Sequence, residues 1–146
     1  MTPDQLFQLA NGLALLNWLL LIILPKWEWT GRITVSVVVT ILSVLYVYLV
    51  FGALRFDDFS SFGSLEGVTQ LFTDGNAVLA GWLHYLAFDL MTGWFIVTNS
   101  IKHDVNRWAV IPCLLLTFML GPSGLLLYII IRTISRRQYF LESAGE

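Results

Sequence analysis

One acidic residue and one histidine lie inside the same apolar run of this sequence. His84 and Asp89 fall between Ala77 and Val97, a stretch long enough to cross a bilayer, and Asp89 is the only acidic residue in any hydrophobic run of the chain. An ionisable group at bilayer depth is costly, and it normally faces the interior of a helix bundle or a water-filled cavity. His84 and Asp89 are therefore the candidate catalytic residues. The alternative is that both side chains are hydrogen-bonded contacts that hold helices together.

Helical geometry limits how these two side chains can cooperate. They are five positions apart, which is about 140° around an ideal helix, so we do not expect them to touch. Instead we expect them to flank one pocket from its two edges.

Depth in the bilayer predicts one polar layer across the molecule. At ~1.5 Å per helical residue, counted from the side that holds residues 55–75, His84 lies about 12 Å deep and Asp89 about 20 Å. Pro122 lies roughly 18 Å from the same side, and Asn17 and Ser43 about 17 Å. We therefore expect these five residues to converge on one interior layer.

The sequence Gly-Pro-Ser-Gly, residues 121–124, interrupts the last apolar segment. Proline has no N–H and its ring clashes with the preceding turn, so it frees backbone carbonyls. Irregular backbone at membrane depth is tolerated only where protein or a cavity satisfies it. The motif either bends a helix and does nothing more, or it lines a ligand site. On the second interpretation the candidate substrate-binding residues are Asn17, Tyr46, Trp82, Tyr85, Gly121 and Pro122.

The composition is that of an integral membrane protein. The chain is 57% hydrophobic, 14% aromatic and only 12% charged, with a mean hydropathy of +0.74. Its net charge of −2 predicts no basic patch of the kind that nucleic-acid binding requires, so we expect no nucleic acid among its partners. The single cysteine, Cys113, has no intrachain partner for a disulfide, and we predict no metal site.

Four apolar segments of the sequence carry these candidate residues. Residues 6–24, 33–54, 76–101 and 108–134 each reach the roughly 20 residues that a bilayer core requires. They predict an all-α membrane protein, a four-transmembrane-helix bundle forming a single domain over residues 1–146. Apolar side chains at spacings of three and four predict an interfacial amphipathic segment at residues 55–75, between helices two and three. Four spans place both termini on one side and divide the basic residues four against four.

Two strings carry a resemblance to a known family. Gly-Trp-Leu-His-Tyr-Leu-Ala-Phe-Asp-Leu at residues 81–90 and Gly-Pro-Ser-Gly-Leu-Leu-Leu-Tyr at residues 121–128 resemble the abscisic-acid-deficient-four family of neoxanthin-synthase-like membrane proteins from plants, algae, cyanobacteria and other bacteria. The resemblance spans nearly all of the four predicted helices. No plastid-type transit peptide precedes the first helix, so we expect an integral protein of the bacterial plasma (inner) membrane.

The resemblance implies acid/base isomerisation of a carotenoid or other isoprenoid lipid, without a cofactor. Opening an epoxide to an allene requires an acid at the oxygen and a base at the carbon that loses a proton. On this basis Asp89 is assigned as the acid and His84 as the base, with Tyr85 and Asn17 orienting the substrate oxygen. The exact substrate does not follow from the resemblance, and the sequence leaves open whether the bundle is a homo-oligomer. A second function class also stays open: a non-catalytic accessory or scaffold protein of a pigment or lipid pathway.

Overall fold

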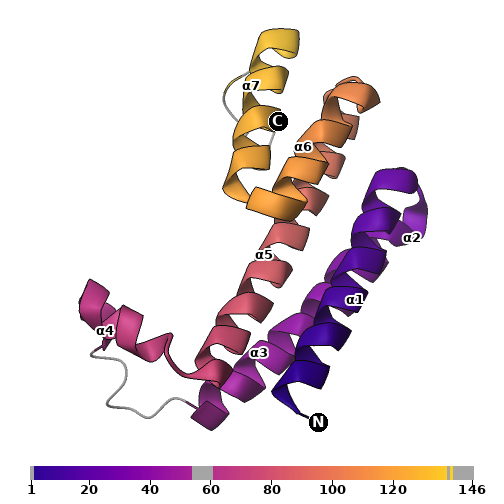
Figure 1. The fold of residues 1–146 in the computed structure, drawn as a ribbon. Helices are drawn as coiled ribbons and strands as arrows, with labels where there is room; N and C mark the ends of the chain where they lie inside the picture. The colour runs from indigo at the N-terminus through magenta and orange to yellow at the C-terminus, as the bar shows by residue number, and fades with distance from the viewer. Residues whose placement is uncertain (1, 54–60, 138, 140–146) are drawn as a thin grey trace, which may run out of the picture.

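The computed structural model describes residues 2–53, 61–137 and 139, and all the regular elements in these residues are helical. The all-α prediction is therefore confirmed. In chain order the elements are α1 (Pro3–Ile23), α2 (Glu28–Gly31), the π-helix η1 (Arg32–Val39), α3 (Thr40–Ala53), α4 (Leu65–Leu71), α5 (Gly75–Lys102), α6 (Arg107–Leu120) and α7 (Pro122–Arg136) (Figure 1).

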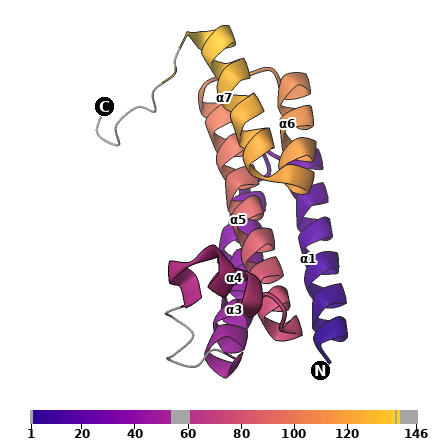
Figure 2. The ribbon, with the colours of Figure 1, turned by 60° about the vertical axis from the view of Figure 1, so that its left-hand side comes forward.

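Helix α5 is the central element of the fold. It contacts α1, η1, α3, α6 and α7, and the other long helices pack along its sides (Figures 1 and 2). Asp74 caps its start: Oδ1 accepts hydrogen bonds from the N–H groups of Asn76 at 2.8 Å and Ala77 at 3.0 Å. Leu83, Leu90 and Ile96 of α5 are fully buried and form the spine of the hydrophobic core.

Two helical segments are long and apolar enough to cross a membrane: α1, and the continuous stretch Glu28–Gly52 formed by α2, η1 and α3. Their outer faces carry large apolar side chains, and Phe51 is 80% exposed. An exposed apolar surface of this kind is typical of a protein that contacts lipid. By length and composition these two segments are the candidate spans among the described residues, and the predicted four-span bundle is not confirmed.

The prediction of one continuous helix over residues 108–134 is wrong. Helix α6 ends at Leu120, Gly121 turns the chain with φ 20° and ψ −86°, and Pro122 starts α7. Helix α7 then runs back alongside α6, so the two form a hairpin (Figures 1 and 2). The 14 and 15 residues of these helices give lengths of about 21 and 22 Å, which is short of a bilayer core of ~30 Å.

Local chemistry explains the reversal. Proline is favoured at the first position of a helix, where its missing N–H costs nothing, so Pro122 begins α7 instead of bending a longer helix. One turn later Gly124 sits against α6, where a Cβ would overlap Thr117 Oγ1 and the carbonyl oxygen of Cys113. The small residue therefore lets the two helix backbones approach closely, as in other membrane helix pairs.

The hairpin changes which residues share an end of the molecule. Arg136 Nη2 at the end of α7 donates to Asp104, in the connection between α5 and α6, through both the backbone carbonyl and Oδ2. The sequence placed the end of the last helix on the same side as the start of the first, whereas α7 ends at the opposite end from the start of α1 (Figure 1).

The predicted interfacial segment is only partly described, because residues 54–60 lie outside the described residues. Within the rest, Ser64 caps the short helix α4 by accepting a hydrogen bond from the Gly67 N–H, and no residue of α4 is buried. Helix α4 projects from the bundle at the end where α1 starts (Figure 1), and Leu65 is 84% exposed. This arrangement agrees with a segment that lies at an interface.

Candidate functional site

His84 lines an apolar cavity of about 290 Å³ between α3, α5 and the segment that joins α4 to α5. The cavity lies at the end of the bundle that carries α4. Most of its wall is aliphatic or aromatic, and the described lining residues with a polar side-chain group are His84 of α5 and Tyr46 of α3. The remaining lining residues are Leu49, Val50, Phe62, Leu71, Phe72, Ala77, Ala80 and Gly81.

The His84 ring is held between two aromatic rings. It stacks on Phe88 with centroids 4.4 Å apart and an interplanar angle of 24°, and its centroid lies 5.5 Å from that of Tyr46. The i, i+4 spacing of His84 and Phe88 on α5 accounts for the stacking. An imidazole and a phenol beside one apolar cavity can together accept and donate a proton.

Gly81 lines this cavity and contacts the ring of Phe72. It lies one turn before His84 on α5, and a Cβ at this position would overlap the ring of Phe72. The glycine therefore lets Phe72, just after α4, pack directly on the α5 backbone. This contact links the α4 segment to the helix that carries His84.

Asp89 faces a different part of the molecule. It is buried, with 7% of its surface exposed, and a Cβ added at Gly121 would overlap its Oδ1 atom. Its Oδ2 atom is buried and makes no hydrogen bond. Asp89 is not among the described residues that line the His84 cavity. The two candidate catalytic residues therefore contact different elements, as the angle of about 140° between them suggested.

Tyr85 connects α5 to the tip of the hairpin. Its hydroxyl donates to the Met119 carbonyl at 3.0 Å and lies 3.5 Å from that of Phe118. The last carbonyls of a helix have no partner within the helix, so Tyr85 caps α6 from outside. Asp89 and Tyr85 share this face of α5, and together they hold the Gly121 turn.

The other predicted substrate contacts occupy separate places. Asn17 is buried and pairs with Thr34 of η1 through two hydrogen bonds of 3.1 and 3.3 Å, so it joins α1 to η1. Trp82 donates from Nε1 to Asn11 Oδ1 at 3.0 Å, and its ring lies 5.3 Å from that of Tyr85. Pro122 is exposed at the start of α7.

The prediction of one shared interior layer is wrong in part. Asn17 and Asp89 are interior, whereas Ser43 and His84 are exposed on the outside of the bundle. Depth along a helix fixes the height of a residue but not its direction around the helix axis. The residues thus divide among the His84 cavity, the hairpin tip and the contact of α1 with η1.

One buried polar network was missed by the sequence analysis. Asn99 Oδ1 accepts hydrogen bonds from the Tyr128 hydroxyl at 2.6 Å and from Arg132 Nη1 at 2.9 Å. Arg132 is 2% exposed, and its Nη2 donates to the Tyr139 carbonyl at 2.7 Å. The available signal was the i, i+4 spacing of Tyr128 and Arg132 in an apolar run. Their partner lies on α5 because α7 folds back, which the sequence did not reveal.

The described residues contain no group of three or more His, Cys, Asp or Glu side chains that could hold a metal ion. Cys113 is buried and free, and its Sγ lies 3.3 Å from the Ala109 carbonyl within α6.

Comparison with known proteins identifies the family. The family model named ABA4-like, described as ABA DEFICIENT 4-like, matches residues 5–128. The chain belongs to the ABA4-like family. Both sequence strings that carry the resemblance, residues 81–90 and 121–128, lie within the matched range. No curated protein and no solved structure matches this chain.

Proposed function

We propose that this ABA4-like protein lies in a membrane and isomerises the epoxide of a carotenoid or related isoprenoid at the His84 cavity. The observation that carries the proposal is the pairing of His84 with Tyr46 in an otherwise apolar cavity. Membership of the ABA4-like family supports a neoxanthin-synthase-like function.

The reaction balances without any co-reactant. The Tyr46 hydroxyl donates a proton to the epoxide oxygen as its bond to carbon breaks, and His84 accepts the proton that leaves the neighbouring carbon. The carbon–hydrogen electron pair forms the new double bond of the allene, and the product has the same mass as the substrate. A proton then returns from His84 to Tyr46, which restores both groups.

The size of the cavity limits how the substrate binds. A volume of about 290 Å³ is near the lower limit of roughly 300 Å³ for ligand pockets. It suits one end group of an elongated isoprenoid and leaves the remainder outside along the exposed apolar face of α3. Phe62 and Phe72, on either side of α4, form part of the entrance wall.

In this proposal Asp89 positions the hairpin and does not transfer a proton to the substrate. Its carboxyl group packs on Gly121, and Tyr85 on the same face caps α6. We therefore assign the acid to Tyr46, which lines the cavity with His84, and not to Asp89 as the sequence suggested.

The test is conversion of a carotenoid epoxide by the purified protein in mild detergent, with two matched pairs of variants. His84→Ala should lose roughly 10²- to 10⁴-fold in rate, the usual contribution of a proton-transfer group, whereas His103→Ala should convert normally. Tyr46→Phe should fall in the same way, whereas Tyr48→Phe, on an exposed residue of the same helix, should not. Equal activity of His84→Ala and His103→Ala would overturn the proposal.

A non-catalytic accessory function is the second candidate. The separation of Asp89 from His84 favours it, because the expected acid and base do not share a cavity. Such a protein would retain a carotenoid through purification and release it unchanged. Pigment retained by the wild type and lost in Gly81→Leu, together with no same-mass product, would support this candidate instead.

A further inference from the structure

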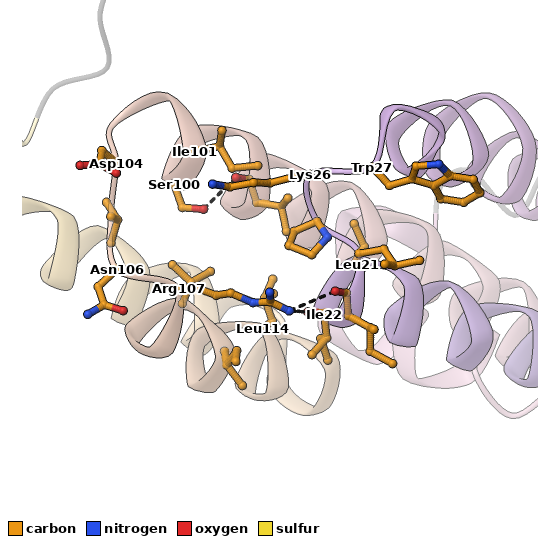
Figure 3. Close-up of a pocket in the computed structure, with 17 residues that line it drawn as sticks. Leu21, Ile22, Lys26, Trp27, Ser100, Ile101, Asp104, Asn106, Arg107 and Leu114 are labelled. Carbon is orange, nitrogen blue, oxygen red and sulfur yellow. Dashed lines mark hydrogen bonds between the residues drawn. The ribbon is translucent and has the colours of Figure 1, made fainter.

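A second cavity, of about 420 Å³, lies at the opposite end of the molecule from α4. It is bounded by the end of α1, the α1–α2 connection, the end of α5 and the start of α6 (Figure 3). Its inner wall is apolar and includes the buried side chains of Leu21 and Leu114. Its rim carries two basic side chains, Lys26 and Arg107.

The two basic residues are held in different ways. Arg107 Nη2 donates to the carbonyl oxygens of Ile22 at 2.9 Å and Ile23 at 3.0 Å, which covers the end of α1 (Figure 3). Both bonds come from the same nitrogen, and they hold the guanidinium at the edge of the cavity. Lys26 extends from the α1–α2 connection and points toward Ser100 (Figure 3).

The electrostatics of this cavity favour an anion. Its one acidic lining residue, Asp104, is paired with Arg136, at 3.1 Å from Oδ2 to Nη2. The start of α6 brings the positive end of one helix dipole, whereas the ends of α1 and α5 bring two negative ends, and Arg107 covers that of α1. Among the lining side chains, Lys26 and Arg107 leave a net positive charge at the rim.

The cavity also belongs to a basic end of the whole molecule. Because α7 folds back, its three arginines join four basic residues at this end, so seven of the eight Lys and Arg residues gather here; the eighth, Arg55, lies outside the described residues. We define the basic end by these residues: Lys26, Arg32, Lys102, Arg107, Arg132, Arg136 and Arg137. Clusters of basic residues beside membrane helices attract the anionic lipids of a leaflet.

We propose that this cavity binds an anionic phospholipid, with its phosphate held by Lys26 and Arg107 and its acyl chains along the apolar wall. The combination of a positive rim and an apolar interior matches the two parts of such a lipid. The exposed side chain of Trp27 at the rim, 47% exposed, suits the membrane–water interface.

Lipid retention by the full-length protein in mild detergent tests the proposal. Phosphatidylglycerol, chain-matched phosphatidylcholine and inorganic phosphate are titrated separately, and bound lipid is counted by native mass spectrometry. Phosphatidylglycerol should bind tightest, and Lys26→Gln should weaken it about fivefold, as expected for the loss of one cation near a lipid phosphate. Lys26→Arg, which keeps the charge, should bind like the wild type.

The matched control is Lys102→Gln, which removes the same charge from the same end but does not line the cavity. It should leave the affinity unchanged, and all variants should unfold at the wild-type temperature. Equal weakening by Lys102→Gln would show general charge attraction and overturn the site. Equal binding of the two lipids, or competition by inorganic phosphate at similar concentration, would also overturn the proposal.

Discussion

His84 and Asp89 are a turn and a half apart on α5 and have different partners. His84 stacks on Phe88 and faces Tyr46, whereas Asp89 packs against Gly121. Helical geometry predicted this divergence from sequence, because an angle of about 140° around the axis separates the two side chains. The sequence could not predict which of them would face a cavity, since that depends on the direction in which α3 and α7 approach α5.

We predict that a side chain at Gly121 lowers the stability of the protein. Its backbone has φ 20° and ψ −86°, and a Cβ would overlap the Asp89 carboxyl group. Gly121→Ala should therefore destabilise the protein by about 1–3 kcal/mol, the usual cost of forcing extra atoms into a packed site. The measurement is thermal or denaturant unfolding in one detergent.

The matched control for this change is Gly12→Ala. Gly12 lies within α1 with no atom within 4 Å of its Cβ position. Alanine there should stabilise the helix by about 0.5–1 kcal/mol, because glycine is unfavourable in a helix interior. If the two substitutions shift stability equally, the tight contact between Gly121 and Asp89 is not what the turn requires.

At the scale of elements, local signals in the sequence were sufficient for α1 and α5. The apolar runs predicted their positions to within a few residues. Local signals in the sequence could not predict the hairpin of α6 and α7. An apolar run over residues 108–134 is long enough for one span, and Pro122 is compatible with either a kink or a reversal. The reversal depends on the Gly121 turn and on the contact of Gly124 with Thr117, which are set by packing.

The hairpin predicts that the end of α7 and the α5–α6 connection lie on the same side of the membrane. In a Cys113→Ser background, single cysteines are placed at exposed positions by Asp4→Cys, Lys102→Cys and Ser135→Cys. A membrane-impermeant thiol reagent applied to one side of oriented vesicles should label Lys102→Cys and Ser135→Cys together, because α7 ends beside the α5–α6 connection. Asp4→Cys should be labelled from the other side. Labelling of Ser135→Cys together with Asp4→Cys would instead indicate that residues 108–134 cross the membrane.

At the scale of the whole molecule, the hairpin gives the two ends different chemistry. One end carries the basic residues and the 420 Å³ cavity, and the other carries α4 and the His84 cavity. Sequence alone divided the basic residues evenly, because it counted α7 as the end of a full span. With the corrected fold, we propose from the positive-inside rule that the basic end faces the cytoplasm and that the His84 cavity lies near the opposite face.

The most direct test of the proposed function compares two variants of α5 in one assay of epoxide isomerisation. His84→Ala should abolish conversion, because it removes the base from the cavity, whereas Asp89→Asn, corrected for the fraction of folded protein, should stay near the wild-type rate. Asparagine keeps the shape that packs on Gly121, and the proposed reaction needs no proton from this position. Lost conversion in folded Asp89→Asn, with normal conversion in His84→Ala, would contradict the proposal and move the chemistry to the hairpin tip.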